Sequence, residues 1–251
     1  MLTFLKKVIM MIDIHAHILP SLDDGPRTFQ ESLEMCRIAS EDGIRKMVAT
    51  PHILNGIYDV KKKDILEKVE ILNKLLKDNK IELEVLPGAD VHLHEGIIEG
   101  LKKDEILTIN NGRRYLLLEF PSQIIPVEAR QVVFKLQVAG ILPIISHPER
   151  NFAIQDNPEL LTKFIEIGAL LQVTAQSVTG EFGSREKKCA HWLLKHNMVH
   201  VLATDAHSIN ARPPILSIAV KKASKLLGEE KSRALVFENP LAIIEGRELR
   251  V

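Results

Sequence analysis

The chain has 251 residues, is 45% hydrophobic, and carries 33 basic and 33 acidic side chains. A chain of this length buries about 70–75% of the surface that its unfolded form exposes, so it can build a full core without disulfides. The charge balance argues against a dedicated nucleic-acid-binding protein, which needs a basic excess or stripe. The two cysteines, Cys36 and Cys189, are too few for a disulfide framework. No apolar run approaches the roughly 20 residues of a membrane span. We predict one domain over 1–251 in the reducing cytoplasm.

The first ten residues form a short apolar stretch that two lysines interrupt, Lys6 and Lys7. A secretory signal needs a longer apolar region followed by a small-residue cleavage site, and neither is present. We therefore expect residues 1–10 to be a tail, or a misassigned start, ahead of a domain that begins near Met11.

Seven short runs of β-branched and other apolar residues, each bounded by Gly, Pro or polar residues, are typical of buried parallel strands. We predict these strands at residues 12–15, 46–50, 83–86, 115–120, 142–146, 169–173 and 199–204. Amphipathic segments separate them, and strands that alternate with helices in this way form a parallel sheet through right-handed crossovers. Seven such units predict an α/β fold, a distorted TIM-like (β/α)7 barrel that is irregular or incompletely closed.

The helix signals are clearest after the first strand. Residues 28–31 fit a capping box, in which Thr28 accepts a hydrogen bond from a free N–H of the first turn and Glu31 reaches back. The helix is expected to end near Asp42, because Gly43 suits a helix stop. Asn157 followed by Pro158 predicts a helix start. Further helices are predicted at residues 61–79, 184–197 and 214–227.

Six of the seven predicted strands end in His, Asp or Glu. In (β/α) barrels the working residues lie at the carboxyl ends of the strands, so these side chains are expected to share one rim. The residues at these ends are His15, His17, His52, Asp90, Glu119, His147, Asp205 and His207. The sixth strand instead brings Thr174 and Gln176, which are polar but poor metal ligands.

These strand-end residues indicate a metal site. Alternation places His15 and His17 on one side of their strand, about 6.5–7 Å apart along the chain, and Asp205 and His207 share this spacing. The set holds imidazoles and carboxylates but no thiolate, which suits Mn, Fe, Zn or Co. It exceeds the three or four ligands of one zinc ion. More than one metal is therefore implied, which favours a shared hydroxide and a clamp on a transferring phosphoryl group.

Other residues leave alternatives open. His92 and His94 form a second His-x-His pair past the third strand, and His92 is a candidate for lining the pocket. Residues 61–63 are three lysines, most simply a solvated helix start, with recruitment of an anionic partner as the alternative. Cysteine-dependent phosphatases need an Arg six positions after the Cys, where this chain has Asp42 and Lys195. Any phosphatase activity should therefore depend on metal.

Together these motifs resemble one known superfamily. The matching segments are Asp-Ile-His-Ala-His-Ile-Leu-Pro at 13–20, Asp-Asp-Gly at 23–25, Ala-Thr-Pro-His at 49–52, Gly-Ala-Asp at 88–90, Leu-Glu-Phe-Pro at 118–121, Ser-His-Pro-Glu-Arg at 146–150 and Thr-Asp-Ala-His at 204–207. They resemble the polymerase and histidinol phosphatase (PHP) superfamily, and within it the CpsB/CapC-like metal-dependent protein-tyrosine phosphatases of capsular polysaccharide synthesis. The resemblance runs in order from about residue 11 to residue 212.

The resemblance implies a barrel of the PHP type with three divalent ions, most simply Mn, with Fe, Zn and Co as alternatives. By motif, the first ion would be held by His15, His17 and Asp205, and Asp90 would bridge it to a second ion held by Glu119 and His147. The third would be held by Asp24, His52 and His207. Arg150 and Arg212 would bind phosphate oxygens, although Arg150 could instead form a structural salt bridge. The family usually has Glu at the position of Asp90, which puts the spacing or affinity of the bridged ions in question.

The function implied is hydrolysis of phosphotyrosine, on the tail of a bacterial tyrosine kinase that regulates capsular or exopolysaccharide synthesis. Two alternatives stay open: a PHP phosphatase of a small phosphomonoester such as histidinol phosphate, and a non-catalytic metal-binding scaffold. An amidohydrolase also carries His-x-His on its first strand, but typically uses a strand-four Lys, and residues 115–120 contain none. We expect no nucleic-acid partner and no membrane insertion, and leave self-association open.

Overall fold

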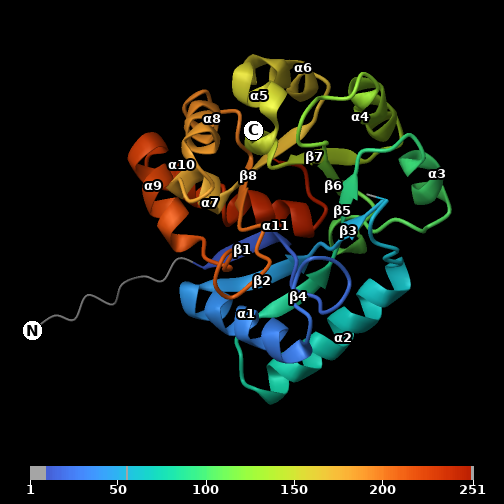
Figure 1. Ribbon diagram of the computed structural model, residues 1–251, viewed down its shortest axis with the longest axis vertical. Helices are drawn as coiled ribbons and strands as arrows, with labels where there is room; N and C mark the ends of the chain where they lie inside the picture. The colour runs from blue at the N-terminus through green and yellow to red at the C-terminus, as the bar shows by residue number, and fades with distance from the viewer. Residues whose placement is uncertain (1–9, 55, 250–251) are drawn as a thin grey trace, which may run out of the picture.

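Parallel strands form the centre of the molecule and helices surround them in the computed structural model, which describes residues 10–54 and 56–249 (Figure 1). The tail expected at residues 1–10 lies outside the described residues except for Met10, which is exposed. Among the described residues, no helix has the length and apolar character that a bilayer crossing requires.

The strands belong to two parallel sheets. The first has the order β1 (Met11–Ala16), β2 (Ile44–Ala49), β4 (Glu84–Pro87). The second has the order β3 (His52–Ile53), β5 (Asp90–His92), β6 (Tyr115–Glu119), β7 (Leu142–Ser146), β8 (Leu170–Thr174), β9 (Val201–Ala203). All seven predicted strands are present, and the predicted α/β barrel fold is confirmed.

Two further short strands, β3 and β5, follow two of the predicted strands after a break, which the sequence analysis did not anticipate. Residues 50–51 separate β2 from β3, and residues 88–89 separate β4 from β5. Pro51 has no N–H to donate to a sheet, so it interrupts the ladder. A Cβ on Gly88 would stand 2.6 Å from Val48 Cγ1, so only glycine allows the two strands to approach this closely. Because the breaks lie side by side, the sheet splits into two where they occur.

The barrel closes at one end only. At the carboxyl end, β1 and the residues after β9 form a parallel bridge between Ala16 and Ala206, and the Asp205 N–H donates to the His15 carbonyl at 2.8 Å. At the other end, residues 235–236 lie between the two strands. The Leu202 N–H donates to the carbonyl of residue 235, and the Ile12 N–H donates to that of residue 236. This inserted segment gives the expected distortion a physical cause.

The helices form the outer layer. Their bounds are α1 (Phe29–Asp42), α2 (Lys62–Asp78), α3 (Ile97–Lys102), α4 (Ala129–Val138), α5 (Phe152–Asp156), α6 (Thr162–Ile165), α7 (Ala175–Thr179), α8 (Ser184–Lys195), α9 (Ser217–Leu227), α10 (Glu229–Ala234) and α11 (Glu238–Ile244). Short 3-10 turns occur at Ile109–Asn111, Pro148–Arg150 and Pro158–Leu161. In Figure 1, α1 and α2 lie together beside β2 and β4.

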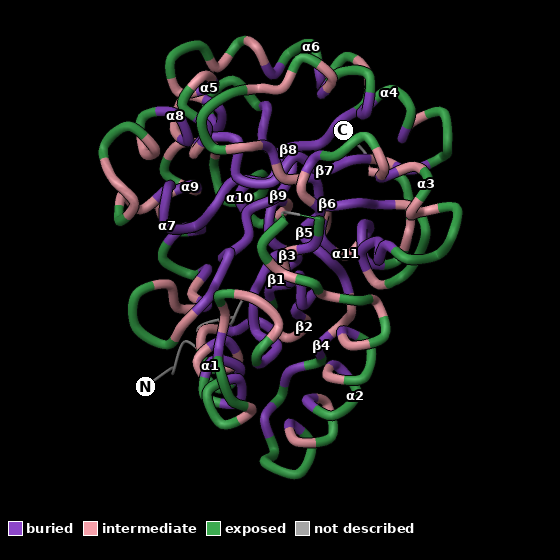
Figure 2. The backbone as a smooth tube through the Cα atoms, turned by 45° about the vertical axis from the view of Figure 1, so that its right-hand side comes forward, coloured by how far each residue is buried: buried purple, intermediate pink, exposed green. Residues whose placement is uncertain are grey.

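Two apolar cores support this arrangement. The larger one lies between the strands and the outer helices. The smaller one fills the barrel interior with strand residues such as Ile14, Leu117 and Ile144, and Ile243 and Ile244 of α11 close it from below. Most strand residues are accordingly buried, with exceptions such as exposed Glu84 of β4, whereas the helices expose their outer sides (Figure 2).

The predicted helices lie near their expected positions, but the way in which three of them begin differs from the prediction. The Thr28 hydroxyl accepts from the Glu31 N–H at 3.2 Å as predicted, but Glu31 reaches back to the N–H of Arg27, one residue earlier than a capping box requires. The helix expected at 214 begins at Ser217, where the carboxylate of Asp42 accepts the N–H groups of residues 216 and 217. Asn157 and Pro158 begin a 3-10 turn instead of an α-helix.

Gly43 ends α1 in the left-handed conformation, at φ 98°, and its N–H donates to the carbonyls of residues 39 and 40. We predict that Gly43→Ala lowers the free energy of unfolding by about 1–2 kcal/mol, because an L residue pays that cost in this conformation. Urea denaturation measures the change. Gly112 has φ −79°, so Gly112→Ala is the matched control and should change stability by no more than about 0.5 kcal/mol. Equal losses in both variants would contradict the prediction.

Candidate metal centre

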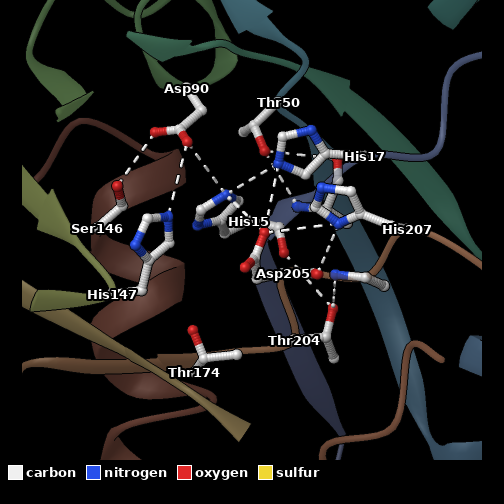
Figure 3. Close-up of polar contacts among 12 residues, drawn as sticks. His15, His17, Thr50, Asp90, Ser146, His147, Thr174, Thr204, Asp205 and His207 are labelled. Carbon is white, nitrogen blue, oxygen red and sulfur yellow. Dashed lines mark hydrogen bonds and ion pairs between the residues drawn. The ribbon is translucent and has the colours of Figure 1, made fainter. Parts of the chain in front are cut away.

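The nine predicted ligand residues converge at the carboxyl end of the barrel. Each belongs to at least one of four groups whose ligand atoms lie within 4.8 Å of one another. The groups are His17, Asp24, His52 and His207; His15, His147 and Asp205; His15, His17 and Asp90; and His52, Asp90 and Glu119. Because the groups share members, they form one continuous cluster, much of which is drawn in Figure 3.

Asp90 lies in the middle of this cluster and is fully buried. Its Oδ2 atom stands 3.4 Å from His52 Nδ1, 3.6 Å from His15 Nε2 and 3.9 Å from His147 Nε2. Its other oxygen accepts a hydrogen bond from the Ser146 hydroxyl at 3.2 Å. Ser146 therefore fixes the carboxylate so that one oxygen faces three imidazoles.

Asp205 connects the histidines to the two predicted arginines. Its Oδ1 atom lies 3.2 Å from His15 Nε2 and 3.4 Å from His17 Nε2. Its Oδ2 atom accepts from Arg150 Nη1 at 2.6 Å and also from Arg212. The two oxygens thus face different partners, and Asp205 is fully buried between them.

Two of the converging residues have unusual backbone conformations. His147 has φ 31° and directly follows β7, and Asp205 has φ 53° and lies two residues after the end of β9. Non-glycine residues in this region cost roughly 1–2 kcal/mol, and such strain concentrates at functional sites. Here the left-handed turn occurs where each chain leaves its strand and its side chain enters the cluster.

The chemistry of these residues fits divalent cations. Among the described residues, no hydrogen-bond partner is found for four buried atoms of the cluster: His52 Nδ1, Asp90 Oδ2, Asp205 Oδ1 and His207 Nε2. Buried polar atoms nearly always form hydrogen bonds, so a cluster of charged groups that form none among themselves indicates a further group to bind. Imidazole nitrogens and carboxylate oxygens are ligands for Mn, Fe, Zn and Co, and a divalent cation would satisfy all four atoms.

The pKa shifts of the cluster residues also favour bound cations. Burial lowers the pKa of His147 to about 4, and Arg150 adds to this effect. Burial alone would raise the pKa of Asp205, but His15, His17 and Arg212 outweigh it and hold that pKa well below its usual range. Burial opposes protonation of His52, yet Asp90 and Glu119 raise its pKa to about 11. The carboxylates thus draw positive charge into the cluster, which metal ions would also supply.

Two side chains that the sequence analysis did not assign a role orient the histidines. Asp23 Oδ2 lies 2.6 Å from His17 Nδ1, and Gln172 Oε1 lies 2.8 Å from His15 Nδ1. Each contact leaves the Nε2 atom of its histidine pointing toward the cluster, and partners of this kind tune the affinity of metal ligands. A signal was available for Gln172, a polar residue within a predicted apolar strand. Asp23 stood unassigned within the Asp-Asp-Gly motif.

The other residues for which the sequence analysis left alternatives open differ in their surroundings. His92 Nδ1 lies 3.4 Å from Glu119 Oε2, so it borders the cluster. His94 accepts from the Gly96 N–H at 2.9 Å in a local turn. Lys62 pairs with Asp104 at 2.8 Å, which favours the structural interpretation for this one of the three lysines.

A family model described as capsular polysaccharide synthesis, CpsB/CapC, matches residues 11–245. The tyrosine-protein phosphatase YwqE of Bacillus subtilis (strain 168) is 41% identical over 202 residues, which cover 80% of this chain and 79% of YwqE. The tyrosine-protein phosphatase CpsB of Streptococcus pneumoniae is 31% identical over 239 residues, which cover 93% and 98% of the two chains.

Solved structures agree with these relatives. A chain from the crystal structures of Bacillus subtilis YwqE and Streptococcus pneumoniae CpsB, described as unique metal-dependent tyrosine phosphatases, superposes with a TM-score of 0.91 at 38% identity, covering 95% of this chain and 96% of that one. The phosphotriesterase homology protein of Escherichia coli superposes with a TM-score of 0.63 at 11% identity, covering 94% and 99%, and supports the barrel fold alone.

We predict that Asp23→Ala lowers metal affinity by about 10–100-fold, because His17 loses the carboxylate that fixes its ring. Isothermal titration of the metal-free protein with Mn²⁺ measures the change. Asp156→Ala removes an exposed carboxylate that pairs only with surface Arg185 among the ion pairs of the described chain, and should leave the affinity unchanged. Wild-type affinity in Asp23→Ala would show that this contact does not tune the centre.

Proposed function

The chain belongs to the CpsB/CapC family of capsular polysaccharide synthesis, and from this premise we propose that it is a metal-dependent protein-tyrosine phosphatase. Relatives that match it over most of their length are named tyrosine-protein phosphatases. The observation that carries the proposal is the convergence of nine imidazole and carboxylate side chains on one end of the barrel. A dense array of metal ligands suits phosphoryl transfer, because bound cations neutralise charge at several oxygens.

The proposed centre holds three ions, most simply Mn²⁺. We assign His15, His17 and Asp205 to the first, Glu119 and His147 to the second with Asp90 as the bridge, and Asp24, His52 and His207 to the third. Two separations in the structure support this division. His207 Nε2 lies 3.3 Å from Asp24 Oδ1, and Glu119 Oε1 lies 3.7 Å from His147 Nε2. Asp90 lies near His15 of the first set and His147 of the second, as the proposed bridge requires, and also near His52 of the third.

When bound, divalent ions lower the pKa of water toward neutrality and stabilise charge on a transferring phosphoryl group. The protein itself contributes Arg150 and Arg212. Their side chains are 33% and 22% exposed, whereas the Asp205 that they share is fully buried. Each guanidinium carries five N–H donors, so it can hold Asp205 and still donate outward to phosphate oxygens. The salt bridge considered as an alternative for Arg150 is therefore compatible with phosphate binding.

We propose phosphotyrosine in a protein as the substrate, and the tail of a bacterial tyrosine kinase of exopolysaccharide synthesis as the partner. The tyrosine leaving group has a pKa of about 10 and departs more readily than a serine alkoxide. The description of the family, capsular polysaccharide synthesis, supports the pathway. We place the reaction in the cytoplasm, because Cys36 and Cys189 are both buried and unpaired, as is usual in a reducing compartment.

The direct test compares turnover of a phosphotyrosine peptide, a phosphoserine peptide and histidinol phosphate, with metal content measured on the same sample. We expect the phosphotyrosine peptide to be hydrolysed fastest, with activity lost on chelation and restored by Mn²⁺. Equal or faster turnover of histidinol phosphate would favour the small-substrate alternative. No turnover with any of Mn, Fe, Zn or Co would favour a non-catalytic scaffold.

Removing either of two ligands tests the centre itself. We expect Asp205→Ala and His147→Ala to lower kcat by at least about 10³-fold, because each change removes a group that holds the ions which stabilise the transition state. Circular dichroism should show that both variants fold. His196 is exposed and stacks on Trp192, so His196→Ala is the control and should keep full activity. Full activity in either ligand variant would refute its assignment.

A further inference from the structure

One aromatic side chain lies over both arginines of the site. The Phe182 ring centroid is 4.9 Å from the guanidinium carbon of Arg150 and 5.6 Å from that of Arg212. These distances are within the range at which a cation is attracted to an aromatic face. Phe182 is half-buried in the loop between α7 and α8. It belongs neither to the nine cluster residues nor to the phosphate-binding pair.

The two arginines therefore contact two partners of different chemistry. Both donate to the same oxygen of buried Asp205, which balances only one of their two positive charges. The other contact is with the Phe182 ring, which attracts cations but carries no net charge. A second carboxylate in its place would also hold the guanidinium groups, but it would repel an incoming phosphate. A phenyl ring holds them without that penalty.

The loop that carries Phe182 is attached to the loop that carries Arg212. The Gln176 side-chain amide donates to Glu181 Oε2 at 2.9 Å and to the carbonyl of Ala211 at 2.9 Å. Residue 181 precedes Phe182, and residue 211 precedes Arg212. One buried amide thus connects the loop that carries the aromatic ring to the loop that carries one of its cations, and this gives Gln176, in α7 just after β8, a role.

Local backbone conformation also fixes this loop. Gly180 has φ 94° and Gly183 has φ 129°, both in the region that favours glycine, and they flank residues 181–182. Glycine adopts these φ values without the cost that a side chain would add, so the two glycines let residues 181–182 take this path toward the arginines.

We propose that Phe182 is a positioning residue that holds Arg150 and Arg212 in their phosphate-binding arrangement, with Gln176 as its tether. This inference rests on the proposed phosphate-binding role of the arginines. It does not require that the substrate be phosphotyrosine, because the ring acts through the guanidinium groups on any phosphate.

The test measures binding of inorganic phosphate to the Mn²⁺-loaded protein by isothermal titration, and kcat/KM for a phosphotyrosine peptide. We expect Phe182→Leu to weaken phosphate binding by about tenfold, because the leucine keeps apolar bulk but loses the aromatic face. The kcat/KM value should fall by a similar factor. Phe182→Trp should restore both values, and metal content and thermal midpoint should match the wild type throughout.

Phe152 provides a matched control, because it is a second phenyl ring near an arginine, 5.6 Å from the guanidinium carbon of Arg185. Phe152→Leu should leave phosphate binding unchanged. Gln176→Met should reproduce the loss seen in Phe182→Leu, and it keeps the proposal testable if the latter variant fails to fold.

Wild-type phosphate affinity in folded Phe182→Leu would overturn the proposal. So would a loss confined to the peptide substrate, which would mean that the ring contacts tyrosine directly and does not act through the arginines. Failure of rescue by Phe182→Trp, with both variants folded, would also overturn it. If the wild type binds phosphate but hydrolyses no phosphotyrosine, only the proposed function fails. If it binds no phosphate, the positioning role fails as well.

Discussion

The structure depends on one buried carboxylate that faces two groups of partners. Asp205 directs one oxygen to the imidazoles of the cluster and the other to the two arginines. A buried carboxylate is costly unless it is paired, and here the pairing is divided between the place proposed for metal and the place proposed for phosphate. This division requires β9 to end beside β1, and Asp13 secures that contact by accepting from the N–H and hydroxyl of Thr204. The contact between the end of β9 and β1 therefore both closes the barrel and brings the site residues together.

The order and type of the strands could be predicted from the sequence because a buried parallel strand needs a short apolar run, and few other structures do. The breaks at residues 50–51 and 88–89 could not be predicted. Each depends on the residues of the neighbouring strand that lie beside it, as the contact between Gly88 and Val48 shows. The segment at residues 235–236 was equally hidden, because it is short and its hydrogen bonds go to two strands that are distant in the chain. Pairing partners far apart in the chain decide such features.

The residues of the candidate site could be predicted from the sequence more completely than the details of the fold. Residue types that bind metals stood at strand ends, and barrel topology brings strand ends together whatever the exact register. Residues that act through another side chain gave weaker signals. Asp23 lies in a matched motif and Gln172 in an apolar strand, but their roles, like that of Phe182, appear only when the distances to His17, His15 and the arginines are known. Recognising ligands needs residue chemistry, whereas recognising their supports needs coordinates.

Asp90 shows how the geometry bears on a departure from the family pattern. A carboxylate shorter by one methylene could fail to reach a bridging position, but Oδ2 already lies 3.4 to 3.9 Å from three imidazoles. Its backbone begins β5 directly after the break at residues 88–89, and its N–H donates to the Pro51 carbonyl at 3.1 Å. The residue thus enters the cluster beside His52. Because Ser146 holds the other oxygen, a longer side chain would need a different rotamer or a shift of this hydroxyl to occupy the same point. In this barrel, the shorter acid is the one that fits the bond to Ser146.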